Sequence, residues 1–299
     1  MKLNIKYIVA ALLSAIVALP LGASAQETKT FTAPKAGDYS FGIDAAPVVN
    51  FLGNMFNGTM NQTLDDIGGT PVTSSSGLVT PDISILGRYM LSGDLAVRAN
   101  VGLIIDNSYN TAYATDDLAV AENPLSEAKV VDGKTTARSG ASLAVGLEYR
   151  IGKGRIQGVF SGNVLYAYST ESYSYSYGNA ITSLNQSPSS GGLDTNNHPT
   201  VSYMSTLRTL KVGGGATHML GLMGTAGVEW FVASRISLGL EVNLVAAYAY
   251  TTQAYGEYEG YNANTSSVET YTNLSSPASS ALYVGTNNFG SNLTLNFYF

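Results

Sequence analysis

The segment that most constrains the fold is the end of the chain, residues 288–299. Its apolar side chains fall on alternate positions: Phe289, Leu293, Leu295, Phe297 and Phe299. A period of two gives a β-strand one apolar and one polar face, and a helix cannot use it. In water, an apolar strand with a free edge promotes aggregation. The pattern therefore predicts a strand that is paired on both sides in a barrel and turns its apolar face toward lipid.

Seven earlier segments share this alternation: 38–51, 81–91, 95–105, 137–151, 155–168, 216–232 and 236–250. Each has about the length that a tilted strand needs to cross a bilayer. Tight turns follow the second, fourth and sixth segments, whereas the other connections are long and polar: 52–80, 107–136, 170–215 and 252–287. This asymmetry is typical of outer-membrane barrels, whose turns are periplasmic and whose loops are extracellular.

The expected fold is therefore all-β: a transmembrane antiparallel up-and-down β-barrel of eight strands, with short periplasmic turns and long extracellular loops. The first segment, 38–51, should pair with the last strand and close the ring. Residues 201–212 also have partial strand character, so ten strands remain the alternative.

The N-terminus has the features of an export signal. Lys2 and Lys6 precede an apolar run from 7 to 19, and Ala23-Ser24-Ala25 forms a small-x-small cleavage pattern. We therefore expect a signal peptide over 1–25, a short periplasmic segment over 26–37 and the barrel over 38–299. The location would be the outer membrane of a Gram-negative bacterium. The absence of cysteine excludes a lipoprotein anchor, disulfides and thiolate metal sites.

Charge argues against nucleic-acid binding. Of 15 Lys and Arg residues, two lie in the signal, which leaves 13 against 21 Asp and Glu and a net charge of −8. No basic stripe is present, so nucleic acid is not expected as a partner.

The charges of the predicted strands all fall on the face opposite the apolar set: Asp44, Arg88, Arg98, Glu148, Arg150, Glu229 and Glu241. Unpaired buried charges are costly, so these side chains should pair inside the barrel. An eight-stranded barrel is only wide enough for side chains to fill it. The pattern predicts a salt-bridge network that plugs the lumen, with a narrow channel or small-molecule transporter as the alternative.

Aromatic residues cluster near the expected membrane interfaces, where Tyr and Trp are favoured. The periplasmic set is Tyr39, Tyr89, Tyr149, Trp230, Phe297 and Phe299, and the outer set is Tyr166, Tyr168, Tyr248 and Tyr250. The long loops are rich in Tyr, Ser, Asn and Gly, the composition of adaptable recognition surfaces. An extracellular ligand is therefore a hypothesis for the loops. Tyr173, Tyr175 and Tyr177 could equally continue the fifth strand beyond the membrane.

No catalytic or metal-binding motif is present, and no cofactor is expected. A hydrolase interpretation would pair His218 with Asp106 or Asp116, but the spacing does not support it. Five loop acids could attract a divalent cation, although their spacing matches no calcium loop: Asp65, Asp66, Asp116, Asp117 and Asp132. A solvated acidic surface is the better interpretation.

The chain resembles the small outer-membrane barrels of the OmpA/OmpX type. The resemblance is architectural and covers nearly all of the mature chain. The ending Leu293, Leu295, Phe297 and Phe299 is similar to the C-terminal signal read by the barrel-assembly machinery, and the inward Glu and Arg residues resemble the ion-pair plug of OmpA barrels. The resemblance implies a non-enzymatic structural or surface-interaction role. The implied partners are outer-membrane lipid, lipopolysaccharide and, during insertion, the assembly machinery. The resemblance does not imply anchoring to the cell wall, because no peptidoglycan-binding domain is expected.

Overall fold

A computed structural model describes residues 31–44, 84–191, 207–284 and 289–299. The predicted signal peptide, the first long loop and the side chain of Asp44 lie outside the described residues. Within the described ranges, no helix is long and apolar enough to cross a membrane.

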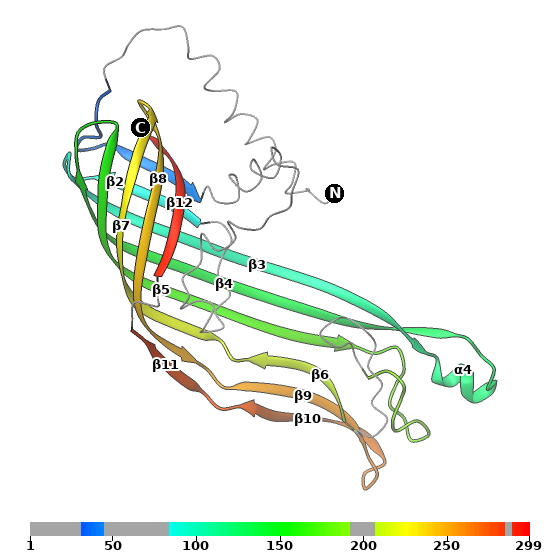
Figure 1. Ribbon diagram of the computed structural model, residues 1–299. Coiled ribbons are helices and arrows are strands. Elements are labelled where there is room, and N and C mark those ends of the chain that lie inside the picture. The colour runs from blue at the N-terminus through cyan, green and yellow to red at the C-terminus, as the bar shows by residue number, and fades with distance from the viewer. Residues whose placement is uncertain (1–30, 45–83, 192–206, 285–288) are drawn as a thin grey trace.

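Eight antiparallel strands form a closed ring: β1 (Tyr39–Asp44), β2 (Ser84–Met90), β3 (Leu95–Thr115), β4 (Lys129–Ile151), β5 (Ile156–Ser176), β7 (Thr217–Ala233), β8 (Ile236–Thr251) and β12 (Phe289–Tyr298). Each pairs with the next in this order, and β12 pairs with β1 to close the ring. The predicted pairing of the first and last strands is therefore present, with Phe41 opposite Phe297. The expected eight-stranded antiparallel barrel is confirmed (Figure 1).

Two segments that we expected to be loops are largely regular β-structure. Residues 107–136 continue β3 and β4 as one long ladder, which is closed by the short helix α4 (Asp117–Glu122). The segment 252–287 contains β9 (Ala254–Asn262), β10 (Ser267–Ser276) and β11 (Ser279–Tyr283). Tyr, Thr and Val favour strands in both segments. Because these extensions have no single apolar face, alternation did not reveal them.

The extra strand near residues 201–212 does not enlarge the ring. It is β6 (Leu207–Gly214), which pairs with β9 and meets β5 at only two register positions, Tyr173 and Ser174. Among the described residues, the ten-strand alternative is therefore wrong. The continuation of the fifth strand through Tyr173 and Tyr175 is confirmed, because β5 ends at Ser176.

β11 and β12 pair in turn with the same side of β8. Tyr283 lies opposite Ala247 and Phe289 opposite Leu244, so the register shifts by three residues between the two strands. An odd shift exchanges the two faces of a strand. Odd-numbered residues of β11 therefore share a face with even-numbered residues of β12, and Leu293, Leu295 and Phe297 of β12 remain on the outer face.

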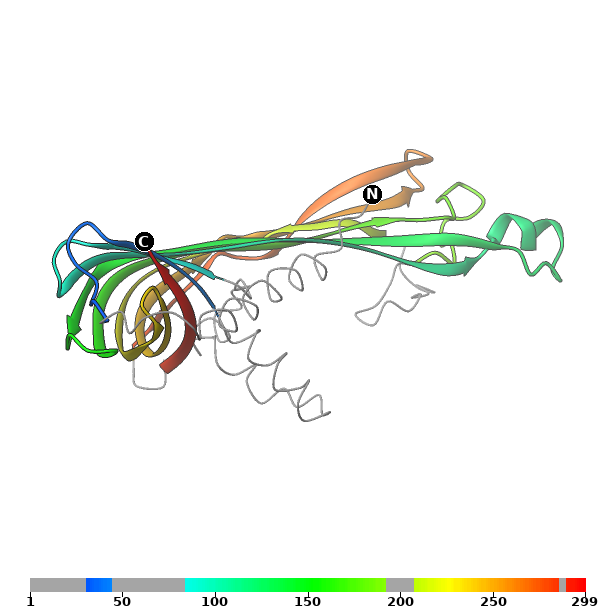
Figure 2. The same ribbon diagram turned by 90° about the horizontal axis from the view of Figure 1, so that it is seen from above.

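The far parts of β3, β4 and β5 extend beyond the ring and join β6, β9 and β10 in one protruding sheet. We call this sheet the blade: residues 106–115, 129–138 and 170–176 with β6, β9 and β10. Figure 2 shows it projecting to one side of the barrel, with α4 at its far end. The short connections 91–94, 152–155 and 234–235 lie at the opposite end of the barrel, the turn end. The blade therefore lies where long surface loops were expected.

The tip of the blade is held by a buried polar cluster. Asn179 is 6% exposed, and its amide donates to the Thr115 carbonyl at 2.7 Å and to Ser190 Oγ at 3.1 Å. Asp132 accepts from Ser190 at 2.7 Å. Burial raises the pKa of the Tyr177 hydroxyl, which donates to a backbone carbonyl of β6 and stays protonated in alkaline solution. These contacts fix the segment 178–191 against β3 and α4.

Replacing Asn179 by Ala should loosen this tip without unfolding the barrel. The loss leaves buried polar groups unsatisfied and costs about 1–3 kcal/mol, all of it at the tip. Limited proteolysis of the folded protein should then cut within 178–191 faster than in the wild type. Asn273 is exposed on β10, so Asn273→Ala is the matched control. Unchanged cleavage of the Asn179 variant would show that the cluster does not hold the segment.

The two faces of the barrel differ in polarity. Outward side chains are apolar and mostly exposed, including Ile85, Leu103, Leu147, Leu222 and Leu240. Inward side chains near the turn end include the buried charged and polar residues together with Met90, Ala96 and Phe231. A small apolar cluster fills the inner face farther up: Ala167, Met219, Val245, Ala247 and Ala249. An exposed apolar outer face with charges inside is the reverse of a water-soluble barrel.

Candidate functional site: an ion-pair network in the lumen

Six charged residues from five strands meet inside the barrel near the turn end. Arg88 lies on β2, Arg98 on β3, Glu148 and Arg150 on β4, Glu229 on β7 and Glu241 on β8, and all are at most 4% exposed. Three carboxylates thus face three guanidinium groups, so the described network is neutral. The side chain of Asp44, expected as a seventh member, lies outside the described residues.

Glu148 is the centre of the network, because it contacts all three arginines. Its Oε2 lies 2.7 Å from Arg88 Nε and 3.3 Å from Arg98 Nη1. Its Oε1 lies 2.9 Å from Arg150 Nη1. Arg88 and Arg98 are directly opposite each other on neighbouring strands. Like charges in that position repel, and the carboxylates that the two arginines share offset this repulsion.

The other two carboxylates complete the pairing across the lumen. Glu241 accepts from Arg88 at 3.1 Å and from Arg98 at 2.9 Å. Glu229 pairs with Arg150, and one of its oxygens lies 3.9 Å from Arg88. Each guanidinium is therefore shared by two or three carboxylates, a role that its planar set of five donors allows.

Neutral side chains satisfy the remaining donors and acceptors. Arg150 donates to Gln157 at 3.0 Å and to the Tyr298 hydroxyl at 2.8 Å, and Tyr298 donates in turn to Glu229 at 2.9 Å. Asn296 accepts from Arg88 at 2.9 Å. Gly42 makes room for this amide, because a Cβ there would lie 2.1 Å from Asn296 Oδ1. Buried ion pairs are tolerated when such bonds complete their shell.

Tyr298, Asn296 and Gln157 were not among the predicted site residues. For Tyr298 a signal existed, since it is the aromatic exception on the polar face of the last strand. That position places its ring inside the barrel, where it packs 5.2 Å from Phe231. Asn296 and Gln157 carried no signal beyond lying on the inward face.

The network leaves little free space in this part of the lumen. A small enclosed cavity next to Arg98 has a volume of about 10 Å³ and is lined by Leu86, Asn100 and Thr294, among others. That is room for roughly one water molecule. The arrangement suits closing a tube, because it holds charge in fixed pairs.

The predicted interface aromatics lie on the outer face of the barrel. Tyr39, Tyr89, Tyr149, Trp230 and Phe299 are about half exposed near the turn end, where Tyr39 and Phe299 stack at 5.4 Å. Tyr166, Tyr248 and Tyr250 are similarly exposed near the blade, whereas Tyr168 and Phe297 are half-buried. In the predicted assembly signal, Leu293 is half-buried and Leu295 is buried.

The hydrolase interpretation finds no support in the geometry. His218 lies on the outer face of β7, with Nδ1 3.0 Å from the Tyr166 hydroxyl. Asp106 lies opposite Arg138, and Asp116 caps α4 at the tip, so neither acid bonds to His218. Asp117 and Asp132 are tied into the tip cluster, and Asp65 and Asp66 lie outside the described residues. In the described part of the chain, no group of three or more His, Asp or Glu side chains could hold a metal ion.

No family model matches the sequence, and no curated protein matches it. Among solved structures, OprG from Pseudomonas aeruginosa is 11% identical over 89% of this chain and 97% of its own, with a TM-score of 0.33. Ail from Yersinia pestis is 9% identical over 88% of this chain and 99% of its own, with a TM-score of 0.31. A major outer membrane protein from Thermus thermophilus is 11% identical over 88% of this chain and 100% of its own, with a TM-score of 0.34. These scores are too low to support an inference, so the fold assignment rests on the chain's own strand pairings.

Proposed function

We propose that this chain is a non-enzymatic outer-membrane β-barrel protein of the OmpA/OmpX-like type, with a closed lumen and a structural or surface-interaction role. The observation that carries the proposal is the inverted polarity of the closed ring. An apolar outer face without a free edge suits lipid, which cannot satisfy unpaired backbone groups. Three carboxylates and three guanidinium groups that pair inside the barrel suit a plug more than a pore.

The short turns then face the periplasm and the blade faces outward. Both aromatic sets fall at the two ends of the apolar band, where the membrane interfaces would lie. Lipid and lipopolysaccharide become the partners of the outer face, and the barrel-assembly machinery becomes the partner of the terminal strand. The cleaved signal peptide over 1–25 supplies export.

The blade is the part that supports surface interaction. It carries Tyr255, Tyr258, Tyr261 and Tyr271 on β9 and β10, beside Ser, Thr and Asn residues. Such surfaces combine rigid aromatic contacts with adaptable hydrogen bonds. A regular sheet also holds these side chains in fixed positions, which lowers the entropy lost on binding a ligand. An extracellular ligand is therefore the proposed partner of the blade.

Planar-bilayer recording tests the plug against the channel alternative. The refolded wild type should show no stable openings, because ion pairs such as Arg98–Glu241 and Arg88–Glu148 cross the lumen. Arg98→Ser combined with Glu241→Ser keeps the network neutral and removes two long side chains, so this variant should conduct. Its openings would prove that the assay detects an unplugged barrel. Stable openings of the wild type would overturn the plug and favour a narrow channel or transporter.

A further inference from the structure

The segment before β1, residues 31–38, lies at the turn end of the barrel, where Figure 1 shows it in blue. One end of this segment is bonded to β2, because the backbone N–H of Gly37 donates to the Met90 carbonyl at 2.9 Å. At the other end, the ring of Phe31 packs 5.0 Å from the ring of Phe231 on β7. Pro34, between these two contacts, is buried. We call this segment the strap.

The two contacts of the strap lie on opposite sides of the barrel. Around the ring, β3, β4 and β5 separate β2 from β7 on one side, and β1, β12 and β8 separate them on the other. Eight strands about 4.8 Å apart and tilted near 40° form a ring about 16 Å across. Six extended residues reach about 20 Å. The chain from Phe31 to Gly37 is therefore long enough to cross the mouth of the lumen.

The strap covers the turn-end side of the ion-pair network. Phe231 points into the lumen, is 1% exposed, and contacts both Phe31 and Tyr298, whose ring centroid is 5.2 Å away. Tyr298 belongs to the network through its bonds to Arg150 and Glu229. The rings of Phe31, Phe231 and Tyr298 therefore connect the strap to the network in one continuous line of aromatic contacts.

The strap has a fixed end and a releasable end. Next to β1 it forms a turn between Lys35 and Asp38, in which Gly37 supplies the left-handed backbone with a φ of 90°. The far end is held by the ring of Phe31, which contacts Phe231 and lies 5.6 Å from the guanidinium of Arg155. Aromatic pairs and cation–π contacts are individually weak. The far end can therefore leave the mouth without breaking any described strand pairing of the barrel.

We propose that the strap is a hinged cap on the lumen, which pivots at Gly37 and is latched by the contacts of Phe31 with Phe231 and Arg155. The latched strap closes the turn end, and the ion-pair network closes the lumen behind it. These two closures act in series, so a barrel without the network conducts only while the strap is released. The cap requires only the closed ring, and it is independent of the orientation of the barrel in a membrane.

Thiol accessibility tests the cap, because the chain contains no cysteine. Met90→Cys places one thiol at a position that is 0% exposed, the next inward position after Arg88 toward the turn end. Ala96→Cys, at the fully buried residue opposite Met90, is a second probe of the same layer. Ser234→Cys lies in the exposed turn between β7 and β8 and measures the reaction of an open thiol.

Each full-length variant is refolded into nanodiscs, which leave both ends of the barrel in water. A charged methanethiosulfonate reagent, which does not cross the lipid, is then added, and mass spectrometry follows the modification over time. Phe31→Ala should raise the modification rate at position 90 about tenfold or more, because the strap loses both contacts of its far end. The rate at position 96 should rise with it, whereas the rate at position 234 should stay the same.

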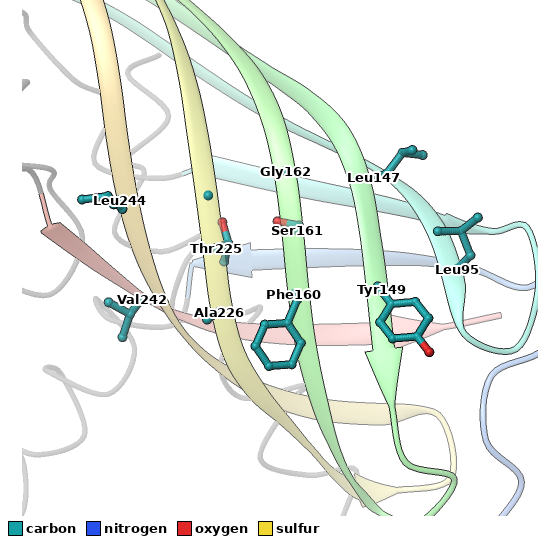
Figure 3. A pocket seen from close by; sticks show the side chains of 11 residues that line it. Leu95, Leu147, Tyr149, Phe160, Ser161, Gly162, Thr225, Ala226, Val242 and Leu244 are labelled. Carbon is teal, nitrogen blue, oxygen red and sulfur yellow. The ribbon is translucent and has the colours of Figure 1, made fainter. Parts of the chain in front are cut away.

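Phe160→Ala is the matched control. Figure 3 shows Phe160 on β5 among the outward side chains, such as Tyr149, and its ring is 47% exposed. This change removes an aromatic ring of the same size from the outer wall, so it should leave the rate at position 90 unchanged. Ala167→Cys, in the apolar cluster farther up the lumen, distinguishes release of the strap from loosening of the whole barrel. It should remain unmodified in every variant.

Equal rates at position 90 with and without Phe31→Ala would overturn the cap. An equal rise with Phe160→Ala, or a simultaneous rise at Ala167→Cys, would overturn it as well, because the barrel would then have loosened as a whole. If Phe31→Ala prevents refolding, Arg155→Gln removes the cation–π contact alone and should still raise the rate at position 90 by about twofold or more. No change in that variant would then reject the latch.

Discussion

Replacing Glu148 by Ala should destabilise the barrel by about 3–5 kcal/mol, the usual cost of removing one partner from a buried ion pair. Glu148 is completely buried and contacts Arg88, Arg98 and Arg150 within 3.3 Å. Its loss leaves three cations with two carboxylates in a space that admits about one water. Urea unfolding of the barrel in lipid vesicles, followed by the fluorescence of Trp230, would measure the change in free energy.

Two further variants distinguish the cost of leaving a buried arginine unpaired from the cost of shortening a side chain. Adding Arg98→Ala to Glu148→Ala restores neutrality, so the double variant should recover part of the lost stability. Glu171→Ala breaks an exposed pair with Arg138, in which the side chains are 44% and 26% exposed, and should cost about 1 kcal/mol or less. If Glu148→Ala costs no more than Glu171→Ala, the lumen network does not stabilise the barrel.

Alternation predicted the barrel wherever one face of a strand meets an apolar medium. From Leu95 to Ile105, the outward residues of β3 are all apolar, and the sequence alone located the strand correctly. Beyond Ile105, the same face carries Asn107, Tyr109 and Thr111, because both faces of the blade are polar enough for water. A sheet of this kind has no binary pattern, so the length of β3, β4 and β5 could not be predicted from periodicity.

The members of the ion-pair network were predictable, but their partners were not. Each charged side chain could be assigned to the inward face from its own strand. The contacts of Arg88 with Glu148 and Glu241 depend instead on how eight strands align when the ring closes. Register is a property of the whole barrel. The burial of Asn179 could not be predicted for the same reason. It depends on residues 178–191 folding back onto β3, where Asn179 donates to the Thr115 carbonyl.

Deleting Phe297, Tyr298 and Phe299 should prevent assembly while leaving export across the inner membrane intact. The deletion removes the pairing of Phe297 with Phe41 and of Tyr298 with Ser40, which closes the turn end of the ring. It also removes the Tyr298 hydroxyl from the ion-pair network. Loss of a buried aromatic side chain alone costs about 3–5 kcal/mol. Cell fractionation should find the processed chain in the periplasm, without a heat-modifiable form in the outer membrane.

A second variant distinguishes the closing of the barrel from recognition of the last strand by the assembly machinery. Phe297→Ala combined with Phe299→Ala keeps the strand pairing and Tyr298, but removes the aromatic ending that resembles the assembly signal. This variant should refold into lipid vesicles almost as well as the wild type, because Phe299 is half exposed and Phe297 only half-buried. In cells it should assemble poorly, since the assembly machinery would no longer recognise the strand. The deletion should fail in both settings, because the ring itself cannot close. Normal assembly of the deletion in cells would show that the last three residues supply neither closure nor signal.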